Sequence, residues 1–123
     1  MDICLPSKAP FPGPYVVQEY IETDANVYKL YVAGKEVRGL VKPCLQAHHG
    51  TVEVRDLEVD TALWSLAHRT GDAVGLDIFG VDVLIGKDGP VLIDVNPFPG
   101  FRGVSDAARL IANHIATVAP RAT

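Results

Sequence analysis

Residues 78–96, with the sequence IFGVDVLIGKDGPVLIDVN, restrict the fold more than any other stretch of the chain. Apolar side chains recur at alternate positions on both sides of a Lys-Asp-Gly turn, which predicts an antiparallel β-hairpin. A loop from Lys87 to Gly89 is favoured, because glycine suits the last, left-handed position of three-residue loops. A slip of one residue would move acids into the apolar face, so the register is well specified.

This register divides the hairpin into two faces with different chemistry. The first face is apolar and pairs Ile85 with Val91, Val83 with Ile93, and Val81 with Val95. The second face pairs Leu84 with Leu92 and Asp82 with Asp94, and it carries Asn96 two residues further along.

Asp82 and Asp94 therefore face one another directly, and like charges in that position repel. Solvent, protonation, a basic side chain or a metal ion would offset the repulsion. Together with Asn96 they offer oxygen ligands without sulfur or imidazole, which suits a hard cation such as Mg²⁺ held by carboxylates and substrate phosphates. Pro97 biases Asn96 towards extended geometry. The alternative is a solvated hairpin face with two exposed acids.

A second hairpin is predicted over residues 27–43, around a type II′ turn at Gly34 and Lys35. In this register Tyr31 faces Arg38 and Lys29 faces Leu40. One face then gathers three cations, namely Lys29, Arg38 and Lys42. A nucleoside triphosphate with Mg²⁺ needs cations for its phosphate oxygens and carboxylates for its metal. The alternative is again a solvated face.

The remaining segments predict an α+β fold, an antiparallel sheet built from two hairpins with helices packed on it. Residues 15–21 read as a short strand and residues 44–56 as a loop. Helical spacing predicts a helix over about residues 59–69, with Trp64 in the core, and a closing helix capped by Ser105. We expect an irregular proline-rich lead-in at 1–14, one domain at 15–118 and a tail at 119–123.

Composition limits the function classes. The net charge of −4 and pI of about 5.4 argue against a generic nucleic-acid binder. Cys4 and Cys44 are far apart and read as free thiols of a reducing, cytoplasmic compartment. No apolar run reaches the roughly 18 residues of a membrane span, so no membrane partner is expected.

The stretches VVQEYI, VYKLYVAGKEV and GLDIFGVDVLIGKDGPVLIDVNPFPGFRGV together resemble the C-terminal subdomain of the ATP-grasp fold. The resemblance is greatest to the inositol 1,3,4-trisphosphate 5/6-kinase family and looser to ribosomal-protein glutamate ligases. It covers residues 15–118. Upstream of Tyr15 there is only the proline-rich stretch, where these families carry a lysine-bearing, glycine-rich subdomain.

The resemblance implies a role for residues in each segment. Adenine would be met by a hinge made of Gln18, Glu19, Tyr20 and Ile21, and the ribose or substrate by Asp24. Lys29 would contact phosphate or substrate, and Lys42 stands where the kinases carry an arginine before proline; both would be catalytic cations. Mg²⁺ would be held by Asp82, Asp94 and Asn96, and the anionic acceptor by Gly100, Arg102 and Gly103.

The implied function is Mg-ATP binding in a phosphotransferase that acts on a polyol phosphate such as an inositol phosphate. One alternative is part of an ATP-dependent carboxylate-amine ligase. Another is a truncated, non-catalytic fragment, or a subunit whose site is completed by a partner chain. His48 and His49 read as a solvated loop or as a substrate phosphate contact, and His68 and His114 as structural or surface residues.

Overall fold

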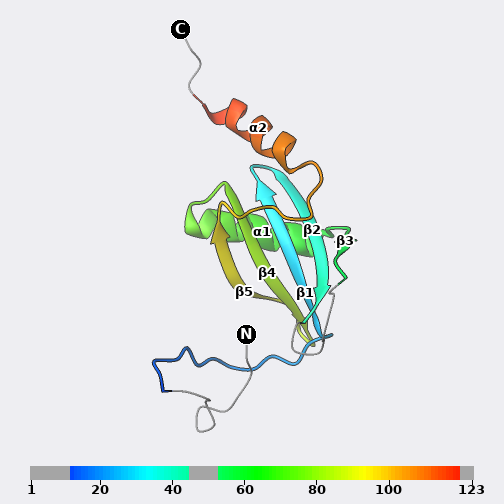
Figure 1. The fold of residues 1–123 in the computed structure, drawn as a ribbon, viewed down its shortest axis with the longest axis vertical. Coiled ribbons are helices and arrows are strands. Elements are labelled where there is room, and N and C mark those ends of the chain that lie inside the picture. The colour runs from blue at the N-terminus through cyan, green and yellow to red at the C-terminus, as the bar shows by residue number, and fades with distance from the viewer. Residues whose placement is uncertain (1–11, 45–52, 120–123) are drawn as a thin grey trace.

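The computed structural model describes residues 12–44 and 53–119, which form one antiparallel sheet and two helices (Figure 1). The sheet has five strands in the order β3-β2-β1-β4-β5. The strands are β1 (Asn26–Ala33), β2 (Glu36–Pro43), β3 (Arg55–Leu57), β4 (Ile78–Gly86) and β5 (Gly89–Pro97). The helices are α1 (Thr61–Val74) and α2 (Ala107–Val118). The predicted α+β class is confirmed.

The first hairpin has the predicted register. Ala33 pairs with Glu36 across the turn, and Tyr31 pairs with Arg38. Gly34 has a φ of 64°, as a type II′ turn needs at its first central residue. β1 also pairs with β4, so the two hairpins lie side by side at the centre of the sheet.

The second hairpin corrects part of the predicted register. Its loop has two residues, Lys87 and Asp88, because Gly86 pairs with Gly89. Gly89, with a φ of 109°, is the first residue of β5 instead of the last residue of the loop. The predicted pairs Ile85–Val91, Val83–Ile93 and Leu84–Leu92 are therefore wrong, and Ile85, Leu84 and Val83 pair with Pro90, Val91 and Leu92.

A β-bulge restores the predicted pairing further along β5. The register shifts by one residue between Asp82 and Val83, so Ile93 is the extra residue on β5. Beyond the bulge, Asp82 pairs with Asp94 and Val81 with Val95, as predicted. The shorter turn and the bulge cancel one another, which places the two carboxylates side by side.

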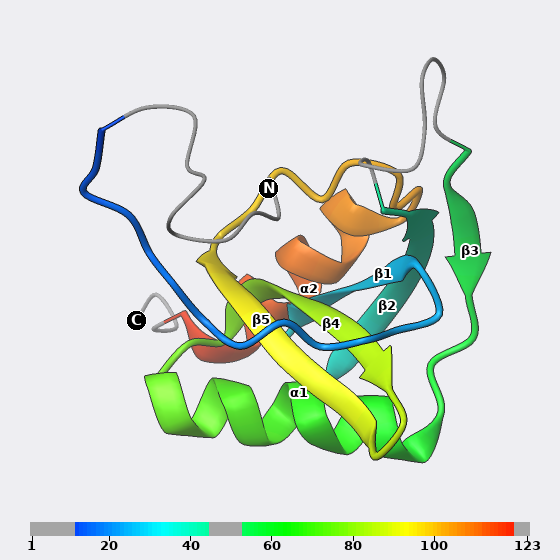
Figure 2. The same cartoon turned by 90° about the horizontal axis from the view of Figure 1, so that it is seen from below.

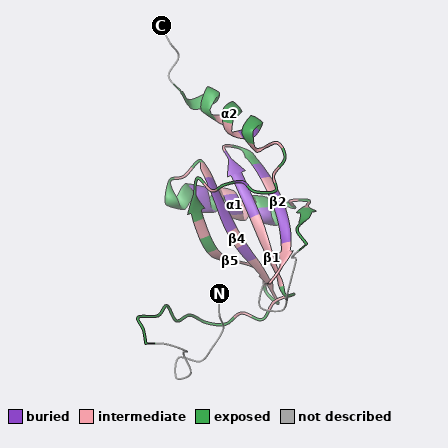
Figure 3. Ribbon diagram, viewed as in Figure 1, coloured by how far each residue is buried: buried purple, intermediate pink, exposed green. Residues whose placement is uncertain are grey.

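Helix α1 covers one face of the sheet (Figure 2). Leu63 and Ala67 of the helix pack on the buried strand residues Leu30, Val32, Val37, Phe79, Val81 and Val83. Figure 3 shows this buried layer along β1 and β4. The helix begins after the N-cap Asp60, whose side chain accepts a hydrogen bond from the Leu63 amide at 2.8 Å.

Two predictions for this helix are wrong. It continues five residues past Arg69, to Val74, and ends at the left-handed Gly75. Gly71 within the helix permits close packing of α1 on Phe79, since a Cβ at Gly71 would lie 2.8 Å from the Phe79 ring. Trp64 is not a core residue, because it lies on the flank of the helix and is 46% exposed. Its ring contacts that of His68, with 4.0 Å between the centroids.

The segment after β5 crosses the other face of the sheet (Figure 1). A Cβ on Gly80 of β4 would lie 3.1 Å from Pro99. Phe101 is buried against Tyr31 of β1, with ring centroids 5.2 Å apart, and Gly103 lies against Leu40 of β2. This segment, residues 98–106, is called the exit loop below. The face of the sheet that α1 does not cover is called the open face below. The exit loop covers one end of this face.

Three further local predictions are wrong. Residues 15–21 form no strand, because no partner strand lies beside them among the described residues. Residues 55–57 form β3 inside the predicted loop. The residue before α2 is Asp106, not Ser105, and its side chain makes no capping hydrogen bond.

Within the described residues, no helix is both long and apolar enough to cross a membrane. Cys44 is a free thiol.

Candidate functional site

A row of three charged residues crosses the middle of the open face. Lys29 on β1 is the Cα partner of Asp82 on β4, which in turn is the partner of Asp94 on β5. Lys29 Nζ donates to Asp82 Oδ1 at 2.9 Å. These two side chains are only 24% and 21% exposed. We call Lys29, Asp82 and Asp94 the charged row.

Asn96 extends this site by one position along β5. Its Nδ2 donates to Asp94 Oδ2 at 3.3 Å, while Asp94 Oδ1 accepts from the Val95 amide at 3.0 Å. Both Asp94 and Asn96 are exposed. The two carboxylates and the amide therefore lie next to one another on one accessible face, which is the donor chemistry that Mg²⁺ takes in proteins together with phosphate and water. Their oxygen donors are of the kind that such a metal takes, and the metal set stays a prediction.

The pairing of β1 with β4 explains why cations and acids share this face. The alternation within each hairpin predicted only which side chains share a face of that hairpin. Nothing in the sequence specified which strands of the two hairpins would pair. The register Lys29 to Asp82 places the first hairpin's cation beside the second hairpin's acid. A basic side chain thus offsets part of the repulsion between the two carboxylates, one of the predicted alternatives.

An apolar row lies next to the charged row. Leu84 and Val91 are Cα partners two positions from Asp82 on the open face, and Val27 lies two positions from Lys29 on β1. All three are half-buried. The predicted register already placed Leu84 on this face, but with Leu92 as its partner instead of Val91. A flat aromatic group would find apolar contact here, beside the charged row.

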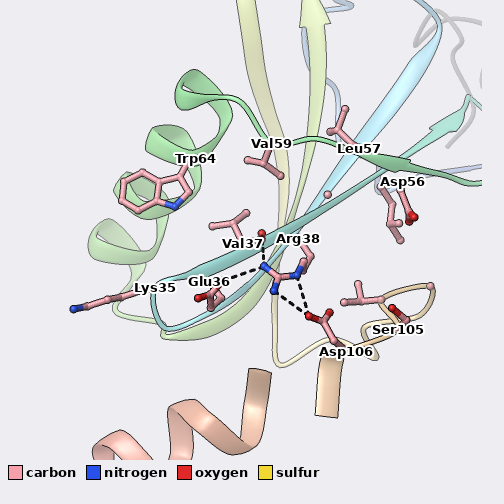
Figure 4. A pocket seen from close by; sticks show the side chains of 14 residues that line it. Lys35, Glu36, Val37, Arg38, Asp56, Leu57, Val59, Trp64, Ser105 and Asp106 are labelled. Carbon is pink, nitrogen blue, oxygen red and sulfur yellow. Dashed lines mark hydrogen bonds and ion pairs between the residues drawn. The ribbon is translucent and has the colours of Figure 1, made fainter. Parts of the chain in front are cut away.

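Arg38 lies on the open face but is already engaged. Its Nη2 and Nε donate to Asp106 Oδ2 at 2.9 and 3.2 Å, and its Nη1 donates to Glu36 Oε2 at 3.0 Å (Figure 4). The hydrogen bond to Asp106 raises the pKa of Arg38, and the same bond lowers the pKa of Asp106. Arg38 therefore ties β2 to the start of α2. Lys42, half-buried at the end of β2, forms no ion pair with any described residue.

The predicted hinge lies at the far end of the second hairpin. Gln18, Glu19 and Tyr20 are exposed, and Tyr20 is 63% exposed. Ile21 packs on Gly86, where a Cβ would lie 3.2 Å from its Cγ2. The segment is thus attached next to the β4–β5 turn, with its side chains accessible.

Asp24 has local partners instead of an open position. Its carboxylate accepts from the Asn26 amide at 3.1 Å and from the hydroxyl of Tyr28. The hydrogen bond with Asp24 raises the pKa of Tyr28, and burial adds to the shift. These contacts fix the start of β1.

The predicted acceptor residues differ in accessibility. Gly100 has open space around it, and Arg102 is exposed. Gly103 has a φ of 91°, and a Cβ there would lie 2.8 Å from Leu40 Cδ1, so it serves the close approach of the loop to β2. Phe98 and Phe101 also have positive φ values, 40° and 52°. Such strained backbone persists only where packing fixes it, and it is found in ligand-binding loops.

A groove of about 510 Å³ lies elsewhere, around the outer edge of β2 (Figure 4). Its walls include Trp64, Asp56, Arg38 and Asp106, and none of the charged row. β3 pairs only with Gly39 to Val41, so the edge of β2 beyond it stays open. We place the functional site at the charged row, since the converging charges lie there.

The two described histidines, His68 and His114, have their contacts away from the charged row. His48 and His49 lie outside the described residues. His114 packs on the turn at Gly34, and its Nε2 lies 3.2 Å from Asp77 Oδ2. These contacts of His114 hold α2 against the first hairpin. His68 lies under Trp64, and its buried Nε2 has no hydrogen-bond partner among the described residues.

Comparison with known proteins defines the class. The fold matches that of the ATP-grasp ligase PsnB complexed with a phosphomimetic variant of its minimal precursor, Mg and ADP. The TM-score is 0.65 at 22% identity, over 80% of this chain and 34% of that one. The family described as the RimK-like ATP-grasp domain matches residues 13–118, and the chain belongs to this family.

Two curated relatives have different activities. Inositol-tetrakisphosphate 1-kinase of Xenopus laevis is 27% identical over 88% of this chain and 35% of its own length. The ribosomal protein bS6–L-glutamate ligase of Salmonella newport (strain SL254) is 32% identical over 72% of this chain and 32% of its own length. The chain thus spans about a third of the length of these relatives. The relatives of this chain therefore include both a kinase and a ligase.

Proposed function

We propose that the open face binds Mg-ATP, with Asp82, Asp94 and Asn96 as metal ligands. The observation that carries this proposal is the charged row, where a lysine and two facing carboxylates adjoin one another on an accessible face. The metal would neutralise the β- and γ-phosphate oxygens when bound. The apolar row beside it provides a surface for the base, and the accessible hinge residues 18–21 would flank that base.

The activity we propose is phosphoryl transfer to a polyol phosphate such as an inositol phosphate. In such a reaction the protein acts by positioning and by charge neutralisation, because the transferred phosphoryl group needs little covalent assistance. Lys29 and Lys42 supply cations on the open face, and Gly100 and Arg102 offer an accessible backbone and a cation for an anionic acceptor. The likeness to inositol-tetrakisphosphate 1-kinase supports this acceptor class.

A carboxylate-amine ligase is the second candidate, supported by the 32% identity to the bS6–L-glutamate ligase. There the phosphoryl group would go to a carboxylate, and an amine would displace phosphate from the acyl phosphate. The same charged row would serve this reaction, so the difference lies in the acceptor. Within the described residues, the acceptor would lie against the exit loop, where Gly100 and Arg102 are accessible.

The site is proposed to be completed by further protein. The chain spans about a third of the length of its relatives, and Asp94 and Asn96 are exposed to solvent. Another part of a longer protein, or a partner chain, would cover the phosphates. A non-catalytic fragment remains the alternative. A cytoplasmic location is proposed from the free thiol of Cys44.

One product assay separates these functions. The chain, alone and with a supplied N-terminal ATP-grasp portion of the kinase relative, is incubated with ATP, Mg²⁺ and either inositol phosphates or glutamate with an acceptor peptide. A kinase yields ADP and a phosphorylated acceptor without free phosphate. A ligase yields ADP and free phosphate in equal amounts, together with an amide bond. ATP left unchanged with every acceptor would contradict both and support the non-catalytic alternative.

A further inference from the structure

The ion pair between Lys29 and Asp82 uses one of the carboxylates assigned to the metal. Lys29 Nζ lies 2.9 Å from Asp82 Oδ1, and both side chains are largely shielded from water. β1 is bordered by β2 and β4 on its two sides, so the backbone at Lys29 is fixed. The side chain of Lys29 has a flexible four-carbon stem, so its ammonium group is able to move while the backbone stays in place.

We infer that Lys29 and the metal ion compete for the carboxylate of Asp82, so that metal binding releases the Lys29 ammonium towards the phosphates. This inference rests on the proposed Mg-ATP site and adds its order of events. The charged row holds one positive and two negative charges, giving a net charge of −1. Without the ammonium itself the two carboxylates carry −2, and a divalent cation brings that charge to 0, so the net attraction that holds the ammonium group at Asp82 is lost.

The arrangement of Asp94 explains why the exchange centres on Asp82. Asp94 is held by the Asn96 amide and the Val95 amide, neither of which carries a charge. A cation arriving between the two carboxylates therefore meets no positive charge at Asp94 but meets the ammonium group at Asp82. Phosphate oxygens held by the same metal would offer the displaced ammonium a new partner, since the lysine stem is flexible. Metal binding and the lysine–phosphate contact are thus coupled.

The test is an NMR titration of the isotope-labelled 123-residue chain with MgCl₂ in the absence of nucleotide. The amide signals of Asp94 and Asn96 report metal binding, and the Cε and Nζ signals of Lys29 report its ion pair. Lys29→Met removes the ammonium but keeps the aliphatic stem. Lys87→Met is the matched control, since it removes the same charge from the exposed turn of the second hairpin.

The inference predicts that the Lys29 signals shift along the same binding curve as those of Asp94. It also predicts that Lys29→Met binds Mg²⁺ about fivefold more tightly than the wild type, while Lys87→Met changes little. Lys29→Arg, which retains the cation, should keep the wild-type affinity and shows whether packing alone is responsible. Unfolding of Lys29→Met would show in its amide spectrum, and the Lys29 signals of the wild type still decide the question.

The possible failures are distinguishable. Metal binding at Asp94 with unchanged Lys29 signals overturns the exchange but leaves the proposed site intact. Equal affinity in the wild type and Lys29→Met does the same. If neither Asp94 nor Asn96 responds to Mg²⁺ with or without ATP, the proposed metal site itself is contradicted, and the exchange falls with it.

Discussion

Replacing Asp94 with asparagine separates stability from function in this chain. Asp82 and Asp94 are directly opposed, where Cβ atoms are about 5 Å apart, so two charges there repel by about 0.8 kcal/mol in a watery environment. The Lys29 ion pair already offsets part of this repulsion. Asparagine keeps one oxygen for the hydrogen bond from the Val95 amide and loses only the longer one, 3.3 Å, from Asn96 Nδ2. We therefore expect Asp94→Asn to stabilise the metal-free chain by about 0.5 kcal/mol.

Thermal unfolding followed by circular dichroism measures this change. For a domain of this size, about 0.5 kcal/mol corresponds to an increase in Tm of about 2–4 °C. Asp88→Asn is the matched control, because it removes the same charge from the exposed turn between β4 and β5. It should leave Tm within about 1 °C, since surface substitutions have small effects. Mg²⁺ with ATP should then raise the Tm of the wild type but not that of Asp94→Asn.

A lower Tm for Asp94→Asn would refute the reasoning, because it would mean that the ionised carboxylate stabilises the fold. An equal rise in Asp94→Asn and Asp88→Asn would also refute it. That result would show a general effect of net charge and no specific repulsion within the charged row.

Three further predictions concern the fold around the site. Gly103→Ala should destabilise the chain by about 1–2 kcal/mol in urea unfolding, since the φ of Gly103 is 91° and a Cβ there would lie 2.8 Å from Leu40. Gly100→Ala is the control, because Gly100 has open space around it, and an equal loss of stability in both variants would contradict the account. Phe79→Ala should cost about 3–5 kcal/mol, because the ring is 1% exposed and fills the space above Gly71; a loss below about 1 kcal/mol would place Phe79 outside the core. Because its ion pair lowers the pKa of Asp106, that carboxylate stabilises the fold above its unfolded pKa of about 4 and loses this effect as pH falls through the lower folded value. Tm profiles of the wild type and Asp106→Asn should therefore converge as the pH falls through that lower folded value, and profiles that stay parallel would argue against the ion pair.

The hairpins and the opposed carboxylates were predictable from the sequence because strand alternation is a local signal. The pairs Tyr31–Arg38 and Asp82–Asp94 follow from turn position and from the two-residue period of a strand. The β-bulge at Ile93 was not predictable, because a two-residue turn plus a bulge and a three-residue turn without one give the same pairing at Asp94. For this reason Leu92 was predicted as the partner of Leu84 in the apolar row, where the structure has Val91.

Non-local contacts account for most of the other differences. No local pattern tells β1 to pair with β4, and that pairing creates the contact between Lys29 and Asp82. Residues 15–21 have the composition of a strand, but strand formation needs a neighbour to accept its backbone hydrogen bonds. Trp64 shares the spacing of the buried stripe only approximately, and its position on the flank of α1 leaves the indole half exposed.

The most direct measurement of the central claim is a calorimetric titration of the chain with ATP, with and without Mg²⁺, for the wild type and Asp94→Asn. The account predicts heat of binding that requires Mg²⁺ in the wild type and is absent from Asp94→Asn, since the open face needs both carboxylates to hold the metal. Binding of equal strength in both proteins, or binding of ATP that does not depend on Mg²⁺, would contradict the assignment of Asp82, Asp94 and Asn96 as the metal site.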